Sequence, residues 1–142
     1  MARLPFIHIQ STKFPIAPGE TEELVNEGTY GKAFAEYLAT HLKQKKYNVA
    51  FTCCEDWGWW VAIKGQPFVL GCCVYGASDS TDKPELCVGI NRNPERRWSW
   101  LRFRFIDTTT RVEQLFRDLK GILASDPDIE ILGYPDEFPL CQ

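Results

Sequence analysis

The sequence predicts an α+β fold, in which a single antiparallel β-sheet of about six to seven strands carries two amphipathic helices on one face. Short runs of alternating apolar and polar residues follow one another between turn signals, as strands do. Two longer segments instead repeat their apolar residues at helical spacing, each with a single apolar stripe. The expected element order is β-α-β-β-β-β-β-α-β. One stripe per helix indicates that both helices cover the same face of the sheet.

Length and composition indicate one globular domain spanning residues 1–142. Hydrophobic residues make up 44% of the chain and charged residues 25%. No apolar run approaches the roughly 20 residues that cross a bilayer, and the strand Phe6–Ile9 is too short for the core of a signal peptide. We therefore expect a cytoplasmic protein with no membrane partner. A net charge of -3 disfavours nucleic acid, because duplex-binding domains carry a basic excess.

The N-terminal third is expected to hold a strand, a loop and a helix. Alternation predicts the first strand over residues 4–10. The acidic segment 11–28 follows, with Thr21 capping a short helical turn. Loops of this length are either binding lids or solvated connections, and the sequence leaves both open. Thr29 is the expected N-cap of the first main helix, whose stripe includes Phe34 and Leu38.

The middle of the chain predicts consecutive strands joined by turns. They are expected at residues 47–55, 58–64, 67–76, 85–91 and 98–105. Asp56-Trp57 and Gly65-Gln66 are predicted to be two-residue hairpin turns. Asp107 is the expected N-cap of the second helix, whose apolar stripe runs to Leu123. A last strand is expected at 128–132, followed by a proline-containing tail.

These turns set the strand register and so assign residues to the two faces of the sheet. The register pairs Cys54 with Trp59, Trp59 with Cys72, and Cys73 with Cys87. The face expected beneath the helices is apolar throughout: Trp59, Val61, Ile63, Phe68, Leu70, Cys72, Val74, Leu86, Val88, Ile90, Leu101, Phe103 and Phe105. The opposite face, which we call the second face, collects Trp60, Gly71, Cys73, Tyr75, Cys87, Gly89, Asn91, Trp98, Trp100, Arg102 and Arg104.

The second face has the composition of a binding surface. Gly71 and Gly89 would leave a floor without side chains, a feature that often marks close approach of a ligand. Trp, Tyr and Arg dominate binding hot spots. The candidate site residues are Trp60, Tyr75, Trp98, Trp100, Arg102 and Arg104, with Glu55 and Asp56 at the hairpin tip. The alternative is that the loop 11–28 and the C-terminal tail seal this face.

Reactive groups are few. The adjacent pairs Cys53-Cys54 and Cys72-Cys73 lack metal-ligand spacing, so we expect no metal and no cofactor, only buried reduced thiols. A Cys73–Cys87 cross-strand disulfide is a minor alternative. Neighbouring strand residues point apart, so we interpret Asp56 as a turn former rather than half of an acid/base pair with Glu55. We interpret His8 as a strand residue hydrogen-bonded to a neighbour.

These observations favour a binding protein over an enzyme, since the chain carries no nucleophile elbow, phosphate loop or dinucleotide fingerprint. The leading hypothesis is a small cytoplasmic, non-enzymatic binding or inhibitor protein, comparable as a class to immunity proteins, whose partner is another protein. One alternative is a small anionic or aromatic ligand such as a nucleotide, held by Arg102 and Arg104. An enzyme using Glu55, Asp56, Cys73 or Cys87 is another. Single-stranded nucleic acid suits the aromatic residues but not the net charge.

Overall fold

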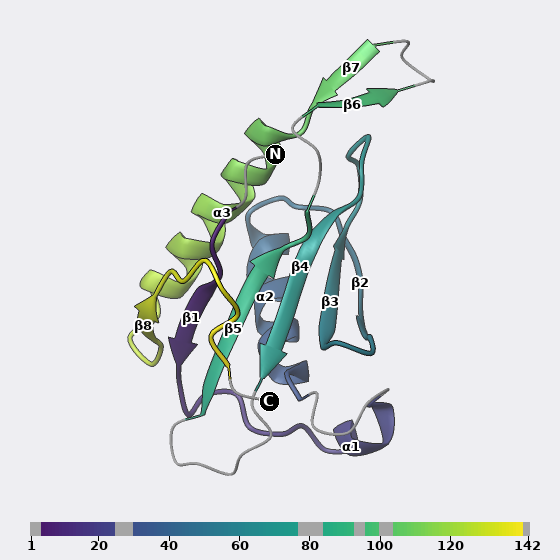
Figure 1. The fold of residues 1–142 in the computed structure, drawn as a ribbon. Helices are drawn as coiled ribbons and strands as arrows, with labels where there is room; N and C mark the ends of the chain where they lie inside the picture. The colour runs from purple at the N-terminus through teal and green to yellow at the C-terminus, as the bar shows by residue number, and fades with distance from the viewer. Residues whose placement is uncertain (1–3, 25–29, 77–83, 93–95, 100–103, 141–142) are drawn as a thin grey trace.

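A computed structural model of the chain describes residues 4–24, 30–76, 84–92, 96–99 and 104–140 (Figure 1). The helices are α1 (Glu20–Glu23), α2 (Lys32–Gln44) and α3 (Thr109–Ala124). The first five strands are β1 (Ile7–Gln10), β2 (Val49–Cys54), β3 (Trp59–Ile63), β4 (Leu70–Gly76) and β5 (Glu85–Ile90). The remaining strands are β6 (Arg96–Ser99), β7 (Arg104–Asp107) and β8 (Glu130–Gly133).

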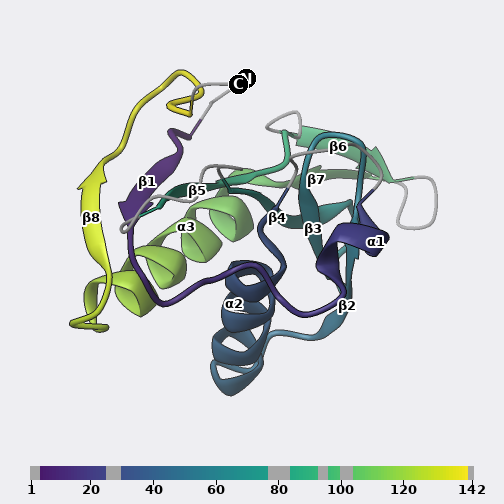
Figure 2. The same cartoon turned by 90° about the horizontal axis from the view of Figure 1, so that it is seen from below.

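The predicted fold class is confirmed. One antiparallel sheet of six strands, in the order β2-β3-β4-β5-β1-β8, carries α2 and α3 on the same side. Figure 2 shows both helices below the sheet. Strands β6 and β7 form a separate two-stranded ribbon. Among the described helices, none is long and apolar enough to cross a membrane.

The core lies between the sheet and the two helices, as the alternation predicts. The sheet residues expected there are buried, except that Ile90 is partly buried and packs against the cluster. Helix α2 contributes Phe34, Leu38 and Leu42, and α3 contributes Leu115 and Leu119, all at helical spacing. Leu101 and Phe103 lie outside the described residues, and Phe105 belongs to β7 of the ribbon rather than to this sheet.

The predicted hairpin turn at Asp56-Trp57 is confirmed. Cys54 pairs with Trp59 and Cys53 with Trp60. The Glu55 amide donates to the Gly58 carbonyl at 2.7 Å, which closes a two-residue turn. This tight connection fixes the register of β2 against β3, and therefore the faces of both strands.

The predicted turn at Gly65-Gln66 is wrong by two residues of register. Trp59 pairs with Val74 instead of Cys72, and Ile63 pairs with Leu70, so residues 64–69 form a longer connection. Pro67 has no N–H to donate to a ladder, and Phe68 turns into the core instead. Because the shift is an even number of residues, every side chain keeps its predicted face.

The β4–β5 register is shifted by the same amount. Cys73 pairs with Gly89, and Cys87 pairs with Tyr75, so the predicted Cys73–Cys87 opposition is wrong. The ladder extends to a Gly76–Leu86 pair, one step further than expected. Both cysteines are free thiols. They are diagonal neighbours on the second face, which is not the directly opposed geometry on which the disulfide alternative rested.

The predicted N-caps are also corrected. Gly31 rather than Thr29 occupies the cap position of α2, and Thr29 lies outside the described residues. Thr108 rather than Asp107 precedes α3, because Asp107 pairs with Arg96 in the ribbon. Thr21 lies inside α1, which Gly19 precedes.

A buried carboxylate from outside the helix satisfies the start of α2. Glu20 is only 1% exposed. Its Oε2 accepts the amides of Gly31 at 2.9 Å and Lys32 at 3.1 Å, and its Oε1 accepts the Ala17 amide at 2.9 Å. The first amides of a helix have no partner within it, and the positive end of the helix dipole favours an anion. Glu20 therefore joins the loop after β1 to the beginning of α2.

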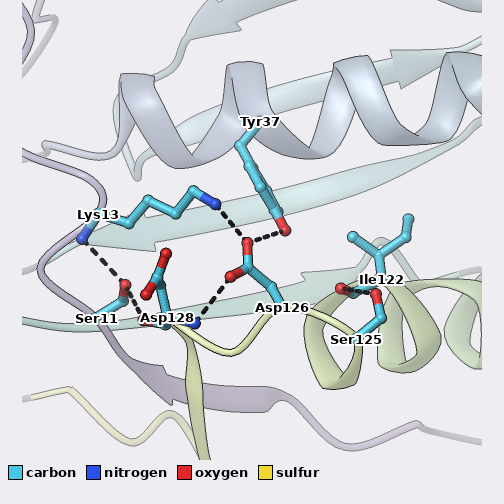
Figure 3. Close-up of polar contacts among 7 residues, drawn as sticks. All are labelled: Ser11, Lys13, Tyr37, Ile122, Ser125, Asp126 and Asp128. Atoms are coloured by element: carbon cyan, nitrogen blue, oxygen red, sulfur yellow. Dashed lines mark hydrogen bonds and ion pairs between the residues drawn. The ribbon is translucent and has the colours of Figure 1, made fainter.

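The loop after β1 is held on the helix side of the sheet. The Phe14 ring centroid lies 4.9 Å from Phe34 and 5.1 Å from Tyr37. Figure 3 shows the polar contacts beside it, where Asp126 Oδ2 accepts from Lys13 Nζ at 2.5 Å and from Tyr37 Oη at 2.8 Å. One carboxylate thus links this loop, α2 and the end of α3.

Replacing Asp126 with asparagine is expected to lower the free energy of unfolding at pH 7 by about 1–2 kcal/mol. The Lys13 ammonium, with the Asp128 amide and the Tyr37 hydroxyl, lowers the pKa of Asp126 from 3.8 to about 2. A depressed pKa in the folded state stabilises the protein above pH 4, and this contribution is lost as the pH falls towards 2. Urea unfolding at pH 7 and at pH 2.5 checks this.

The control for this prediction is Asp128→Asn, because the exposed Asp128 contributes its backbone amide to the cluster. It should unfold like the wild type at both pH values. A difference between Asp126→Asn and the wild type that stays constant from pH 7 to pH 2.5 would contradict the assignment to the ionised carboxylate.

Candidate functional site

The second face is built from β3, β4 and β5 by the alternation of strand side chains. Trp60 pairs with Cys73, and Tyr75 pairs with Cys87, which places all four on the side of the sheet away from the helices. Cys87 also pairs with His8 of β1. This part of the predicted face is therefore assembled as expected.

The predicted open glycine floor is not present, because rings of the protein itself lie over both glycines. A Cβ at Gly71 would overlap the Trp60 ring and the Val61 carbonyl oxygen. A Cβ at Gly89 would lie 2.9 Å from the Phe6 ring. The close approach that glycines permit in strands is thus used by Trp60 and Phe6.

The half of the second face around Tyr75 is covered by the two ends of the chain. The Tyr75 ring centroid lies 4.8 Å from Phe138 and 6.2 Å from Phe6, and these last two are 5.9 Å apart. The Phe6 amide donates to the Pro135 carbonyl at 2.9 Å. Figure 2 shows the tail after β8 on the side of the sheet away from the helices. The alternative of a sealed face is therefore correct for the tail, whereas residues 11–24 pack on the helix side.

The other half of the second face is open. A groove of about 380 Å³ lies over β2, β3 and the connection 64–69, and its lining includes Phe51, Trp60, Ala62, Pro67 and Val69. Phe51 is 47% exposed and Val69 is 58% exposed. The groove also borders β2, which is an edge strand of the sheet and pairs with β3 on one side. We call this feature the Trp60 groove.

The hairpin tip lies at the opposite end of the same strands and carries its own exposed ring. Trp57 is 37% exposed, and its ring centroid is 5.5 Å from that of Tyr75. Asp56 is exposed in the turn, whereas the Glu55 carboxylate accepts from the Cys53 thiol at 3.4 Å. The tip therefore presents an aromatic ring beside acidic residues.

Two of the remaining candidate residues, Trp98 and Arg104, lie outside the six-stranded sheet. Trp98 and Arg104 lie on β6 and β7, where Trp98 pairs with Phe105 and Ser99 with Arg104. The predicted single strand 98–105 is therefore wrong, because the chain reverses between these residues. Alternation continues through the segment and carries no signal for the reversal. Trp100 and Arg102 lie outside the described residues.

The thiols of the second face are poor nucleophiles at neutral pH. Burial raises the pKa of Cys73 to about 11, despite a hydrogen bond with Tyr75 that lowers it. Burial and the neighbouring Cys73 raise the pKa of Cys87 to about 12. Because the thiolate is the reactive form, neither thiol is activated. These shifts do not support catalysis by Cys73 or Cys87.

His8 lies beside Glu85, with which it forms an ion pair only when its ring is protonated. Its Nε2 lies 2.7 Å from Glu85 Oε1 of the neighbouring strand, close enough for an ion pair but not aligned as a hydrogen bond. Among the described residues, no group of three or more His, Cys, Asp or Glu side chains is arranged to hold a metal ion.

Two exposed residues of the groove, Phe51 and Val69, were absent from the candidates. The alternation of strand side chains would have placed Phe51 on the second face, because it lies two residues before Cys53 on a strand whose turn was predicted correctly. The same argument would have found Val69, because it lies two residues before Gly71 in the predicted strand 67–76 and so has the parity of the second face. Comparison with protein-family models, with curated proteins and with solved structures finds no match to this chain.

Proposed function

We propose that this chain is a cytoplasmic, non-enzymatic binding protein that engages a partner protein through the Trp60 groove. The observation that carries the proposal is a groove of about 380 Å³, lined by both apolar and polar residues, with two exposed apolar side chains, Phe51 and Val69, at its rim. Exposed apolar surface gathered in one place marks interaction sites in soluble proteins. The partner would insert an apolar side chain against the Trp60 ring.

Two neighbouring features support a protein partner over a small ligand. The outer edge of β2 offers backbone groups to an extended segment of a partner, which is a common mode of peptide recognition. The acidic, aromatic hairpin tip at Asp56 and Trp57 adds a second contact at the other end of β2 and β3. A basic partner would be attracted to this tip, as in the class of inhibitor and immunity proteins.

Replacing Phe51 with aspartate is expected to weaken partner binding by at least about 30-fold, which corresponds to about 2 kcal/mol for a central apolar contact. Phe51 and Val69 are better test positions than Trp60, because the Trp60 ring also packs on Gly71 and its removal would disturb the sheet. The protein would be used to capture partners from extract of its source cells, and each captured protein would be purified and titrated against every variant.

The matched control is Leu132→Asp, which places the same charge at a residue that is 41% exposed on β8, at the other edge of the sheet. A partner that binds the wild type and this control equally, and Phe51→Asp and Val69→Asp weakly, is the expected result. Equal binding by all variants, or no stoichiometric complex with the wild type, would contradict the proposal. Weaker binding at high salt would assign part of the affinity to the acidic tip.

A further inference from the structure

A second concave site lies on the helix side, at the end of the sheet where α2 ends and α3 begins. The cavity measures about 450 Å³, within the range of small-molecule sites. Lys45 and Lys46 reach it from the end of α2, Lys64 from the end of β3, and Arg111 from the first turns of α3. In Figure 1 the C-terminal end of α2 and the N-terminal end of α3 lie at this end of the sheet. We propose that this cavity binds a small phosphate ester of nucleotide size.

The charge of the cavity is opposite to that of the whole protein. Lys45, Lys46 and Arg111 line it together with Lys64, whose Nζ also lies 5.8 Å from the Phe51 ring in the Trp60 groove, whereas the chain carries a net charge of -3. Within the described residues the ion pairs are His8–Glu85, Lys13–Asp126 and Lys32–Glu23, so none of the four cations is paired with a carboxylate there. Like charges gathered in a concavity repel one another and favour an anion between them.

The one carboxylate in the lining is engaged by neutral donors. Asp118 Oδ2 accepts from Tyr47 Oη at 2.5 Å, and both Asp118 oxygens lie 3.2 Å from Gln114 Nε2. This arrangement fixes the Asp118 side chain by hydrogen bonds from neutral groups and leaves the cations without a carboxylate partner. Lys and Arg are the side chains that hold phosphate groups, Arg through paired N–H donors.

The end of α2 sets the position of Lys46. Helix α2 ends in a Schellman motif, in which the Tyr47 amide donates to Leu42 O at 3.0 Å and the Lys46 amide to Lys43 O at 3.0 Å. This motif places Lys46 at a φ of 75°, where glycine is the favoured residue. Lys46 is the only non-glycine residue with positive φ in the described part of the chain. The helix end accounts for this conformation, and it places the Lys46 side chain at the cavity.

Lysines near the end of a helix also stabilise its dipole, and this is the competing explanation. Lys43 separates the two roles, because it lies in the last turn of α2 but does not line the cavity. A dipole effect would treat Lys43 and Lys46 alike, whereas an anion site requires Lys46 and not Lys43.

The rest of the lining indicates what else the ligand carries. Ile63 and Leu70 provide an apolar wall, and Gln66 lies between this cavity and the Trp60 groove and lines both. Gln66 Oε1 is buried and has no hydrogen-bond partner among the described residues. It is an acceptor and needs an O–H or N–H donor. A ligand with a phosphate for the cations, a hydroxyl or ring N–H for Gln66 and a flat apolar part has the chemistry of a nucleoside monophosphate.

The test titrates adenosine 5′-monophosphate, ribose 5-phosphate, adenosine and sulfate into the protein at about 0.15 M salt, with calorimetry as the readout. The variants are Arg111→Gln and Lys46→Gly, with Lys43→Gln as the matched control. We expect saturable binding of the phosphate esters, about tenfold weaker in Arg111→Gln and in Lys46→Gly and unchanged in Lys43→Gln. Adenosine and sulfate should bind more weakly than the monophosphate.

Lys46→Gly separates an effect on binding from an effect on the stability of the fold. Glycine relieves the positive φ, so this variant should melt a few degrees higher, by about 3 °C, while binding the phosphate esters less tightly. No saturable binding to the wild type, equal binding by Lys43→Gln and Arg111→Gln, or sulfate binding as tight as that of the monophosphate would each overturn the proposal.

Discussion

Replacing Glu20 with alanine is expected to lower the free energy of unfolding by about 3–5 kcal/mol, because three backbone amides lose their acceptor. The Glu20 carboxylate accepts three backbone amides, from Ala17, Gly31 and Lys32. Alanine would leave these donors without a partner at the start of α2, each at a cost of about 1–3 kcal/mol when buried. Urea unfolding followed by circular dichroism measures the change.

Two further variants separate the carboxylate from its position in the chain. Glu20→Gln keeps the shape but has one acceptor oxygen, so it is expected to lose less, about 2 kcal/mol. Glu22→Ala removes an exposed carboxylate from the same short helix and should stay within about 0.5 kcal/mol of the wild type. If Glu20→Ala were as mild as Glu22→Ala, the proposed capping of α2 by Glu20 would be wrong.

Replacing Gly71 with alanine is expected to lower the free energy of unfolding by about 3 kcal/mol, at the upper end for overpacking. The added Cβ would meet the Trp60 ring and also the Val61 carbonyl oxygen of the adjacent strand. The ring can move, but the carbonyl belongs to the β3–β4 ladder and can move only with the strand. Denaturant unfolding followed by tryptophan fluorescence measures both the loss of stability and the change around Trp60.

A double-mutant cycle divides this effect into its two parts. Trp60→Ala combined with Gly71→Ala removes the overlap with the ring, so the pair should be less destabilised than the sum of the single variants, by about 1 kcal/mol. Gly121→Ala is a control in which the free energy of unfolding should rise instead of fall. Gly121 lies exposed in α3 with nothing near its added Cβ, and alanine there should stabilise the protein by about 0.5–1 kcal/mol. Full additivity in the cycle would mean that the Trp60 ring does not lie on Gly71.

The covered and open halves of the second face have different consequences for function. Around Tyr75 the rings of Phe6 and Phe138 occupy the surface, so this candidate residue is largely structural. Around Trp60 the groove is open and borders the edge strand β2. The proposed partner surface is therefore smaller than the face predicted from alternation, and it includes Phe51 and Val69.

From the sequence alone we could predict the fold class, the two helix stripes, the Asp56-Trp57 turn and the faces of the residues in β3, β4 and β5. These features are local, since a period of two or of 3.6 and a turn between two strands are properties of consecutive residues. The faces remained correct although the β3–β4 register was wrong, because a shift of two residues preserves parity.

Contacts between distant segments set where the ladders stop, what caps α2 and what covers the second face. The cap is Glu20, eleven residues before Gly31. The ring that covers Gly89 of β5 belongs to Phe6, just before β1. The basic cavity likewise joins Lys46 to Arg111 from two separate helices. Such contacts depend on packing between distant segments, which no local pattern encodes, and both proposed binding sites depend on them.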